Sequence, residues 1–330
     1  SASSNVIEEK QAPTLAELVR KYDTEKLIEF LRGEEDLQLD EDDFKILRDE
    51  KITGRDFLKA TKQDFRDYGM KGGPASRLVD FAKEVKEKKL RAFSSYHSLR
   101  EVLLNYGLDS DGIESIPLFT LPTYEIQDND KHFTHCMAEI LKACKTNTLW
   151  HYSTLPSTSY GTTLKKKFSM RPQYEITGEK STGRVDYAIK ETEDLICITE
   201  DKQHKVPMGY AQNIAQLESS FETNKKKRKA SEAFDDDDFD YLYGIVTTGR
   251  DWHFLLYSPN QISQGSKLPY TIEFTEDALK EESEEHLALR KSVKKVLGVI
   301  VALLEDRACV GKSPTTKRAR VEGYRAKKMM

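Results

Sequence analysis

The chain has 330 residues, of which 38% are hydrophobic, enough for one large domain or two ordinary ones. A formal net charge of −4 excludes a polyanion-binding signature spread over the whole molecule, so any nucleic-acid contact has to come from local patches. Four cysteines without CxxC pairing exclude a disulfide scaffold and indicate a reducing compartment. The polar first residues and the lack of a long apolar run predict a soluble intracellular protein without membrane contact.

Residues 1–13 are polar and predicted to be disordered, and residues 14–92 form the first predicted domain. Its apolar residues recur at three- and four-residue spacing, which predicts helices, one over 15–32 and a long one from Pro74. Gly54 is predicted to be a turn residue, Thr61 opens a Thr-x-x-acid capping box, and Gly69 fits a left-handed C-cap. This spacing resembles the SAM (sterile alpha motif) domain. The resemblance implies an all-α five-helix bundle from a family with oligomerising, partner-binding and some RNA-binding members.

The charges of this domain are unevenly distributed. Residues 33–43 are strongly acidic, whereas the last helix carries seven basic residues between 71 and 91. An acidic middle and a basic end can dock head to tail, so residues 14–92 are expected to bind a second copy or another SAM domain. The alternative is that both are ordinary solvated faces.

After a predicted linker over 93–124, the character of the sequence changes to mixed α/β, and residues 125–306 form the second predicted domain. A helix is expected over 132–146, followed by strands, a glutamine-bearing helix, a charged mobile loop at 224–240 and a long last helix. The strands are expected at 173–177, 184–190, 194–200, 241–247 and 252–258, the last helix at about 276–306, and a basic tail at 307–330.

Two of the predicted strands carry acidic residues at places where they can meet. Asp186 lies inside one strand, and Glu200 and Lys202 share one face at the end of the next. If the strands pair in antiparallel fashion, Asp186 comes close to Glu200, and the repulsion between them is neutralised by protonation or by a divalent cation. Oxygen ligands select hard ions such as Mg²⁺. Lys202 could then orient a water or stabilise charge developing on a phosphate.

This order of elements, with D…ExK on successive strands, resembles the PD-(D/E)XK nuclease superfamily over about residues 125–260. The resemblance implies a restriction-endonuclease-like fold, with a central mixed sheet flanked by helices. It also implies that Asp186, Glu200 and the carbonyl of Asp201 bind Mg²⁺ or Mn²⁺, and that Lys202 assists the attacking water. The family's proline before the first acid is Val185 here.

The same resemblance implies further site residues. The helix after the third strand often brings a glutamine to the site in this superfamily, and Gln212 or Gln216 could fill that role. Some members add a glutamate from the first helix, for which Glu139 is the candidate. The alternative is that residues 200–202 are a strand end running into a polar turn, with Asp186 an edge-strand charge.

The expected function is therefore a Mg²⁺-dependent endonuclease that cuts DNA in preference to RNA. A SAM-like unit before a nuclease-like unit also resembles fungal Crinkler-like proteins. Two alternatives stay open, an inactive nuclease-fold effector or binding module and a SAM-based scaffold. Two basic runs, KKKRK at 225–229 and KRAR at 317–320, resemble nuclear localisation signals and could contact phosphate backbones, so a nuclear location is expected, with shuttling to the cytoplasm left open.

Overall fold

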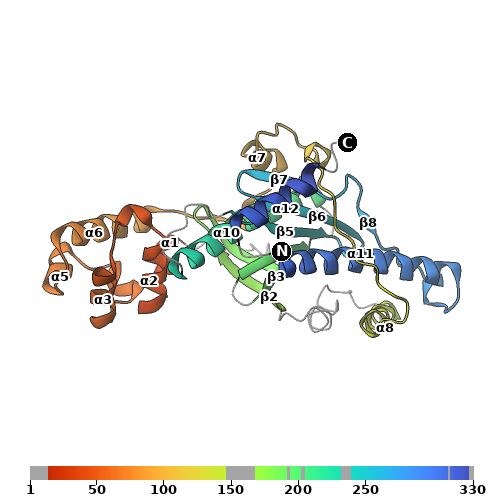
Figure 1. Ribbon diagram of the computed structural model, residues 1–330, viewed down its shortest axis with the longest axis horizontal. Coiled ribbons are helices and arrows are strands. Elements are labelled where there is room, and N and C mark those ends of the chain that lie inside the picture. Colours follow the sequence, from red (N-terminus) through yellow and green to blue (C-terminus); the bar gives the residue numbers. More distant parts are fainter. Residues whose placement is uncertain are drawn as a thin grey trace, which may run out of the picture. The chain divides into compact units, whose positions relative to one another are not determined.

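The computed structural model describes residues 14–145, 168–191, 194–201, 205–231, 239–310 and 313–326. The predictions made for residues 1–13 and for Lys202 fall outside these ranges. The chain divides into two units (Figure 1). The first holds residues 1–95, 177–183 and 222–236, and the second holds residues 96–176, 184–221 and 237–330.

The first unit is helical between residues 14 and 90. It contains α1 (Leu15–Val19), α2 (Thr24–Arg32), the 3-10 turn η1 (Glu35–Leu37), α3 (Glu41–Asp49), α4 (Gly54–Phe57), α5 (Lys62–Asp67) and α6 (Gly72–Glu87). This stretch thus has six α-helices where five were predicted. The single helix predicted over 15–32 is two helices, because the Asp23 side chain accepts a 2.9 Å bond from the Lys26 N–H and starts α2 anew.

The starts of these helices follow from local capping signals. Thr61 is the N-cap of α5, where its hydroxyl and the Asp64 carboxylate bond reciprocally to each other's backbone N–H. The predicted capping box is therefore confirmed. Gly69, after the end of α5, has φ +97, so its prediction as a left-handed C-cap is also confirmed.

Gly54 occupies a different position from the predicted turn. It is the first residue of α4, and its N–H donates to the carbonyl of Tyr22 at 2.9 Å. A Cβ at this position would lie 1.8 Å from the carbonyl oxygen of Val19. Glycine is needed because the end of α1 presses backbone against backbone here.

Gly54→Ala is expected to lower the free energy of unfolding of the first unit by about 2 kcal/mol or more, because a backbone carbonyl cannot yield as a side chain can. Urea denaturation followed by circular dichroism measures the change. Gly72→Ala at the first residue of α6 is the matched control, since nothing lies within 4 Å of its added Cβ. Equal midpoints for the two variants would contradict this packing.

The second unit contains an α/β arrangement with a mixed sheet, as predicted. Its helical segments are α7 (Leu99–Leu104), η3 (Ile113–Ser115), α8 (Lys131–Lys145), α10 (Val206–Ser231), η5 (Asp277–Leu279), α11 (Glu284–Cys309) and α12 (Pro314–Ala326). Its strands are β2 (Phe168–Thr177), β3 (Ser181–Glu191), β4 (Asp194–Asp201), β5 (Leu242–Thr247), β6 (Asp251–Ser258), β7 (Gln261–Gln264) and β8 (Tyr270–Thr271). The first residues of β3 and the end of α10 are grouped with the first unit.

The strand pairing sets the frame for the site. Strand β3 pairs with β2 and, in antiparallel fashion, with β4, whereas β4 and β5 are parallel because α10 connects them. Strand β6 is antiparallel to β5, β7 and β8. The short strand β1 (Arg91–Ala92) pairs in parallel with Ser181 and Thr182 within the first unit.

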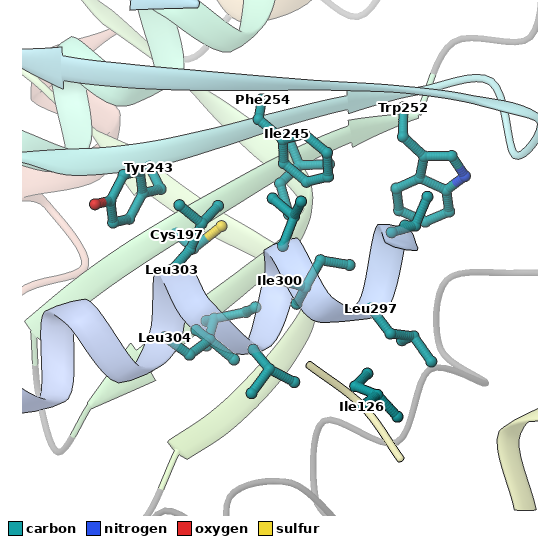
Figure 2. Close-up of a cluster of buried hydrophobic side chains, with 14 of the residues drawn as sticks. Ile126, Cys197, Tyr243, Ile245, Trp252, Phe254, Leu297, Ile300, Leu303 and Leu304 are labelled. Atoms are coloured by element: carbon teal, nitrogen blue, oxygen red, sulfur yellow. The ribbon is translucent and has the colours of Figure 1, made fainter. Parts of the chain in front are cut away.

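Helices cover both faces of this sheet. Figure 2 shows Tyr243, Ile245 and Cys197 packed against Ile300 and Leu304 of α11, in a buried apolar cluster. Gly244 lies between Tyr243 and Ile245, and a Cβ there would meet Asn213 and Leu217 of α10. Because successive strand residues point to opposite faces, α10 and α11 cover opposite faces of the sheet.

Three predicted irregular segments contain regular structure. The segment 93–124, predicted as a linker, holds the 3-10 turn η2 (Phe93–Ser95), α7 and η3, with Val102, Leu103 and Phe119 buried. The predicted loop 224–240 is helical up to Ser231, because α10 extends through the basic run. Its residues 232–238 lie outside the described part of the chain.

The predicted basic tail, 307–330, contains α12. This helix docks through a buried carboxylate, Asp306 at the end of α11, which accepts a 2.6 Å bond from the Tyr324 hydroxyl. The hydroxyls of Tyr241 and Tyr243 donate to the same carboxylate at 2.5 and 2.8 Å. The sequence predicted a basic tail from the charges of this segment alone, because the residues that bind α12 are distant from it in the sequence.

Candidate active site

The register of β3 against β4 brings the two predicted acids to one place. Tyr187 lies opposite Thr199, so Asp186 and Glu200 are the next residues along the two strands. The backbone N–H of Asp201 donates to Asp186 Oδ2 at 2.8 Å, which ties the first acid to the end of β4. The structure therefore places Asp186 beside the acidic end of the neighbouring strand, as the alternation of residues predicted.

Glu200 is buried on the α10 face of the sheet, with 4% of its surface exposed. The Gln216 side chain donates to Glu200 Oε2 through Nε2 at 2.6 Å. Asn213 Nδ2 is 3.4 Å from Gln216 Oε1 and also donates to the Ile198 carbonyl at 3.1 Å. Asn213 thus fixes the Gln216 amide in the orientation that presents its N–H to Glu200.

The remaining predicted site residues lie in different surroundings. Gln212 donates to the Tyr96 carbonyl at 3.4 Å, and the other candidate glutamine, Gln216, donates to Glu200. Glu139 lies half-buried in α8. Asp201 is the last residue of β4, and Lys202 follows it outside the described residues.

The donor chemistry of this place fits a hard divalent cation. Asp186 and Glu200 offer carboxylate oxygens, and the Asp201 carbonyl could add a third oxygen. Across the described ranges, no group of three or more His, Cys, Asp or Glu side chains is placed to hold a metal ion, so Glu139 does not complete such a group. Water or substrate oxygens would have to complete the shell, as is usual for Mg²⁺.

A buried histidine lies on the same face of the sheet. Glu200 pairs with Val246 of the parallel strand β5, and Val246 pairs with His253 of β6. The His253 ring packs edge-on against Tyr210 of α10, with 5.3 Å between centroids. Burial lowers its pKa to about 4, against a smaller opposing effect of Asp251. Its Nδ1 has no hydrogen-bond partner among the described residues.

His253 gives the second unit an expected pH dependence. The unfolded chain takes up a proton near its ordinary pKa of about 6.5, whereas the folded chain resists until about 4. The stabilising contribution of neutral His253 is complete above the pKa of the unfolded chain and is lost as the pH falls towards the pKa of the folded chain. The free energy of unfolding should therefore fall by about 2 kcal/mol between about pH 7 and pH 5. Urea denaturation of His253→Gln should show a flatter slope over this range. His97→Gln, at an exposed position, should keep the parent slope, and identical slopes for all three chains would contradict the expectation.

The two basic runs are held differently. Residues 225–229 belong to the last turns of α10. In the KRAR run of α12, Lys317 is buried and pairs with Asp240 at 2.9 Å, and the Arg318 guanidinium stacks on Phe239 at 4.5 Å. Arg320 lies 3.3 Å from Asp306. Lys317 is therefore buried in the fold, whereas the other three residues of the KRAR run are exposed, as predicted for this segment.

Sequence reasoning missed two residues that contact the acids or their partners. Gln173 Nε2 of β2 donates to Asp186 Oδ1 at 3.2 Å, and Asn213 orients Gln216 as described above. Pro172, which interrupts the β2 pattern, indicates an edge or a bulge and was the available signal for Gln173. Asn213 lies three residues before Gln216, a spacing that places both on one helix face.

Comparison with known proteins supports part of this organisation. Residues 1–84 match the family described as SAM-like domain. The chain is 29% identical to Crinkler effector protein 1 of Rhizophagus irregularis over 239 residues, which are 67% of this chain and 47% of that protein. The chain thus spans about half the length of this curated relative. No solved structure matches the chain. The SAM-like domain and the Crinkler-like architecture are supported.

Among the described residues, no helix combines the length and the apolar character needed to cross a bilayer.

Proposed function

We propose that the α/β unit is a metal-dependent nuclease that hydrolyses phosphodiester bonds of nucleic acid, DNA in preference to RNA. The observation that carries the proposal is the pair formed by Asp186, in the middle of β3, and Glu200, near the end of β4, each held by a hydrogen-bond donor. The order α8, β2, β3, β4, α10, β5 supports it, because it is the order on which the PD-(D/E)XK resemblance rests.

The side chains have separate parts in this chemistry. Asp186, Glu200 and the Asp201 carbonyl would hold Mg²⁺ or Mn²⁺, which when bound lowers the pKa of a water and neutralises phosphate charge. Gln216 keeps the buried Glu200 carboxylate pointed at the site. Lys202, two residues after Glu200, would hold the attacking water and offset the charge that develops on the phosphate.

Cleavage assays test the proposal. The purified chain should cut plasmid, single-stranded DNA or RNA only with Mg²⁺ or Mn²⁺, and Lys202→Ala should lower the single-turnover rate by about 10²-fold while calorimetry finds metal affinity kept. Lys205→Ala, at an exposed lysine nearby, is the control and should cleave at the parent rate. A Lys202→Ala chain that cleaves like the parent contradicts the assignment of this lysine.

The same assays separate the nuclease from a non-catalytic binding module. If no substrate is cut with either metal, but nucleic acid binds and the binding survives Glu200→Ala, the unit holds its ligand without hydrolysing it. The name of the relative, an effector protein, is compatible with either role.

We further propose that the SAM-like unit assembles head to tail with a second copy or with another SAM domain. The basic end of α6 is available for this, because Lys86, Lys88 and Lys89 are exposed. Arg77 is used within the unit, where it donates to the carbonyls of Leu37 and Gln38. Light scattering should show concentration-dependent assembly that disappears when residues 1–92 are removed. A monomer at all concentrations contradicts self-association.

We propose a nuclear location driven by residues 225–229, because Lys317 of the KRAR run is buried in an ion pair with Asp240. Fluorescent fusions test this, and replacement of residues 225–229 by glutamines should exclude the chain from nuclei. Nuclear signal that survives this replacement contradicts the assignment.

A further inference from the structure

Gln173 has an unusual backbone conformation for a residue in a strand. It belongs to β2, yet its φ is +47, in the left-handed region that favours glycine and that is unfavourable for a residue with a Cβ. Its side chain is exposed, so no core packing explains why a glutamine is kept here. Strained residues of this kind persist where the surrounding structure holds them, often at functional sites.

The side chain of Gln173 reaches Asp186. Its Nε2 donates to Oδ1 at 3.2 Å, while the Asp201 N–H donates to Oδ2 at 2.8 Å. The two carboxylate oxygens are therefore fixed from two sides, by an edge strand and by the end of β4. A carboxylate has about four lone-pair positions, so each oxygen keeps one free for another partner.

We propose that Gln173 is a positioning residue for the metal site, and that its left-handed backbone directs its side chain at Asp186. The inference rests on the proposed function. With both oxygens fixed, the free lone pairs of Asp186 have a constant direction, so Asp186 and Glu200 would hold a metal ion with a carboxylate that is already oriented. Without the Gln173 amide, the carboxylate can turn about its terminal torsion while Asp201 holds only one oxygen.

Glycine at position 173 separates this role from a structural one. Gln173→Gly removes the amide and relieves the left-handed backbone, so the melting temperature should stay level or rise while metal affinity falls. Gln38 provides a matched control in the SAM-like unit, because it is also an exposed glutamine, with φ +45. Gln38→Gly should change stability in the same direction and leave metal affinity unchanged.

The experiment is a calorimetric titration of Mn²⁺ into the full chain and its two variants, with the Mg²⁺ dependence of cleavage measured beside it. We expect Gln173→Gly to bind Mn²⁺ about tenfold more weakly, within the range found when groups that orient metal ligands are removed. The Mg²⁺ concentration for half-maximal cleavage should rise by a similar factor, and excess Mg²⁺ should restore the parent rate.

The outcomes that overturn the inference are distinct. Equal Mn²⁺ affinity of Gln173→Gly and the parent overturns the positioning role and leaves the proposed nuclease standing. A clearly lower melting temperature of Gln173→Gly shows that the side chain serves stability and also overturns it. A parent chain that binds no Mn²⁺ overturns the proposed function together with this inference.

Discussion

Replacing Glu200 by glutamine is expected to lower the rate of metal-dependent cleavage by about 10²-fold or more, while the second unit stays as stable as the parent or becomes more stable. Glu200 is 4% exposed, and a charged side chain is costly to bury. Glutamine has nearly the same shape and can still accept the bond from Gln216, so this buried contact is kept. The metal loses one of its anionic ligands, and with it the charge compensation of the transition state.

A lower cleavage rate together with unchanged or higher stability distinguishes a catalytic carboxylate from a structural one. Single-turnover cleavage gives the rate, and thermal unfolding gives the stability. Glu175→Gln, at an exposed position of β2, is the control and should match the parent in both. A Glu200→Gln chain that cleaves normally, or that unfolds at a much lower temperature, contradicts the proposed role.

Removing the Asp240 carboxylate should cause the largest loss of stability that the structure predicts. Asp240 is fully buried and lies 3.0 Å from Arg307 and 2.9 Å from Lys317, whose side chains are 4% and 10% exposed. Burial alone would lower the pKa of Arg307. The nearby Asp240 and Tyr241 outweigh this effect and raise the pKa above its ordinary value, so the guanidinium stays charged. Asp240→Ala leaves this cation buried without its main partner, at a cost of about 3–5 kcal/mol.

A double-mutant cycle tests this account of the ion pair. Asp240→Leu combined with Arg307→Met removes both charges of this pair, while Lys317 keeps its charge, and should be less destabilising than Asp240→Leu alone. Urea denaturation measures all variants. The exposed pair Arg250 and Glu273 is the control, because Glu273→Ala at the surface should have little effect. Additive losses for Asp240 and Arg307 would show that the two groups act independently.

The parts of the fold that could be predicted are those that depend on residues close together in the sequence. Alternation placed Asp186 and Glu200 on neighbouring strands, because a period of two fixes which side chains share a face. The Thr61 capping box and the Gly69 C-cap were also readable, since each depends on residues within three or four positions.

The parts that could not be predicted depend on contacts between distant residues. Gly54 is needed because of the backbone of Val19, which no local pattern reveals. The charges of the segment that forms α12 predicted a basic tail, although Lys317 has a buried partner 77 positions earlier, at Asp240. The left-handed backbone of Gln173 was also not predicted, because a glutamine does not itself indicate a positive φ and the neighbouring Pro172 indicates only an edge or a bulge.

The most direct test of the central claim counts bound ions and measures cleavage on the same sample. The parent chain and Asp186→Asn are each titrated with Mn²⁺ by calorimetry, and plasmid cleavage is followed at every concentration. The account predicts that the parent binds Mn²⁺ at a site whose half-saturation matches half-maximal cleavage, and that Asp186→Asn loses both. Cleavage that persists in Asp186→Asn, or a parent chain that binds Mn²⁺ and cuts no nucleic acid, would contradict it.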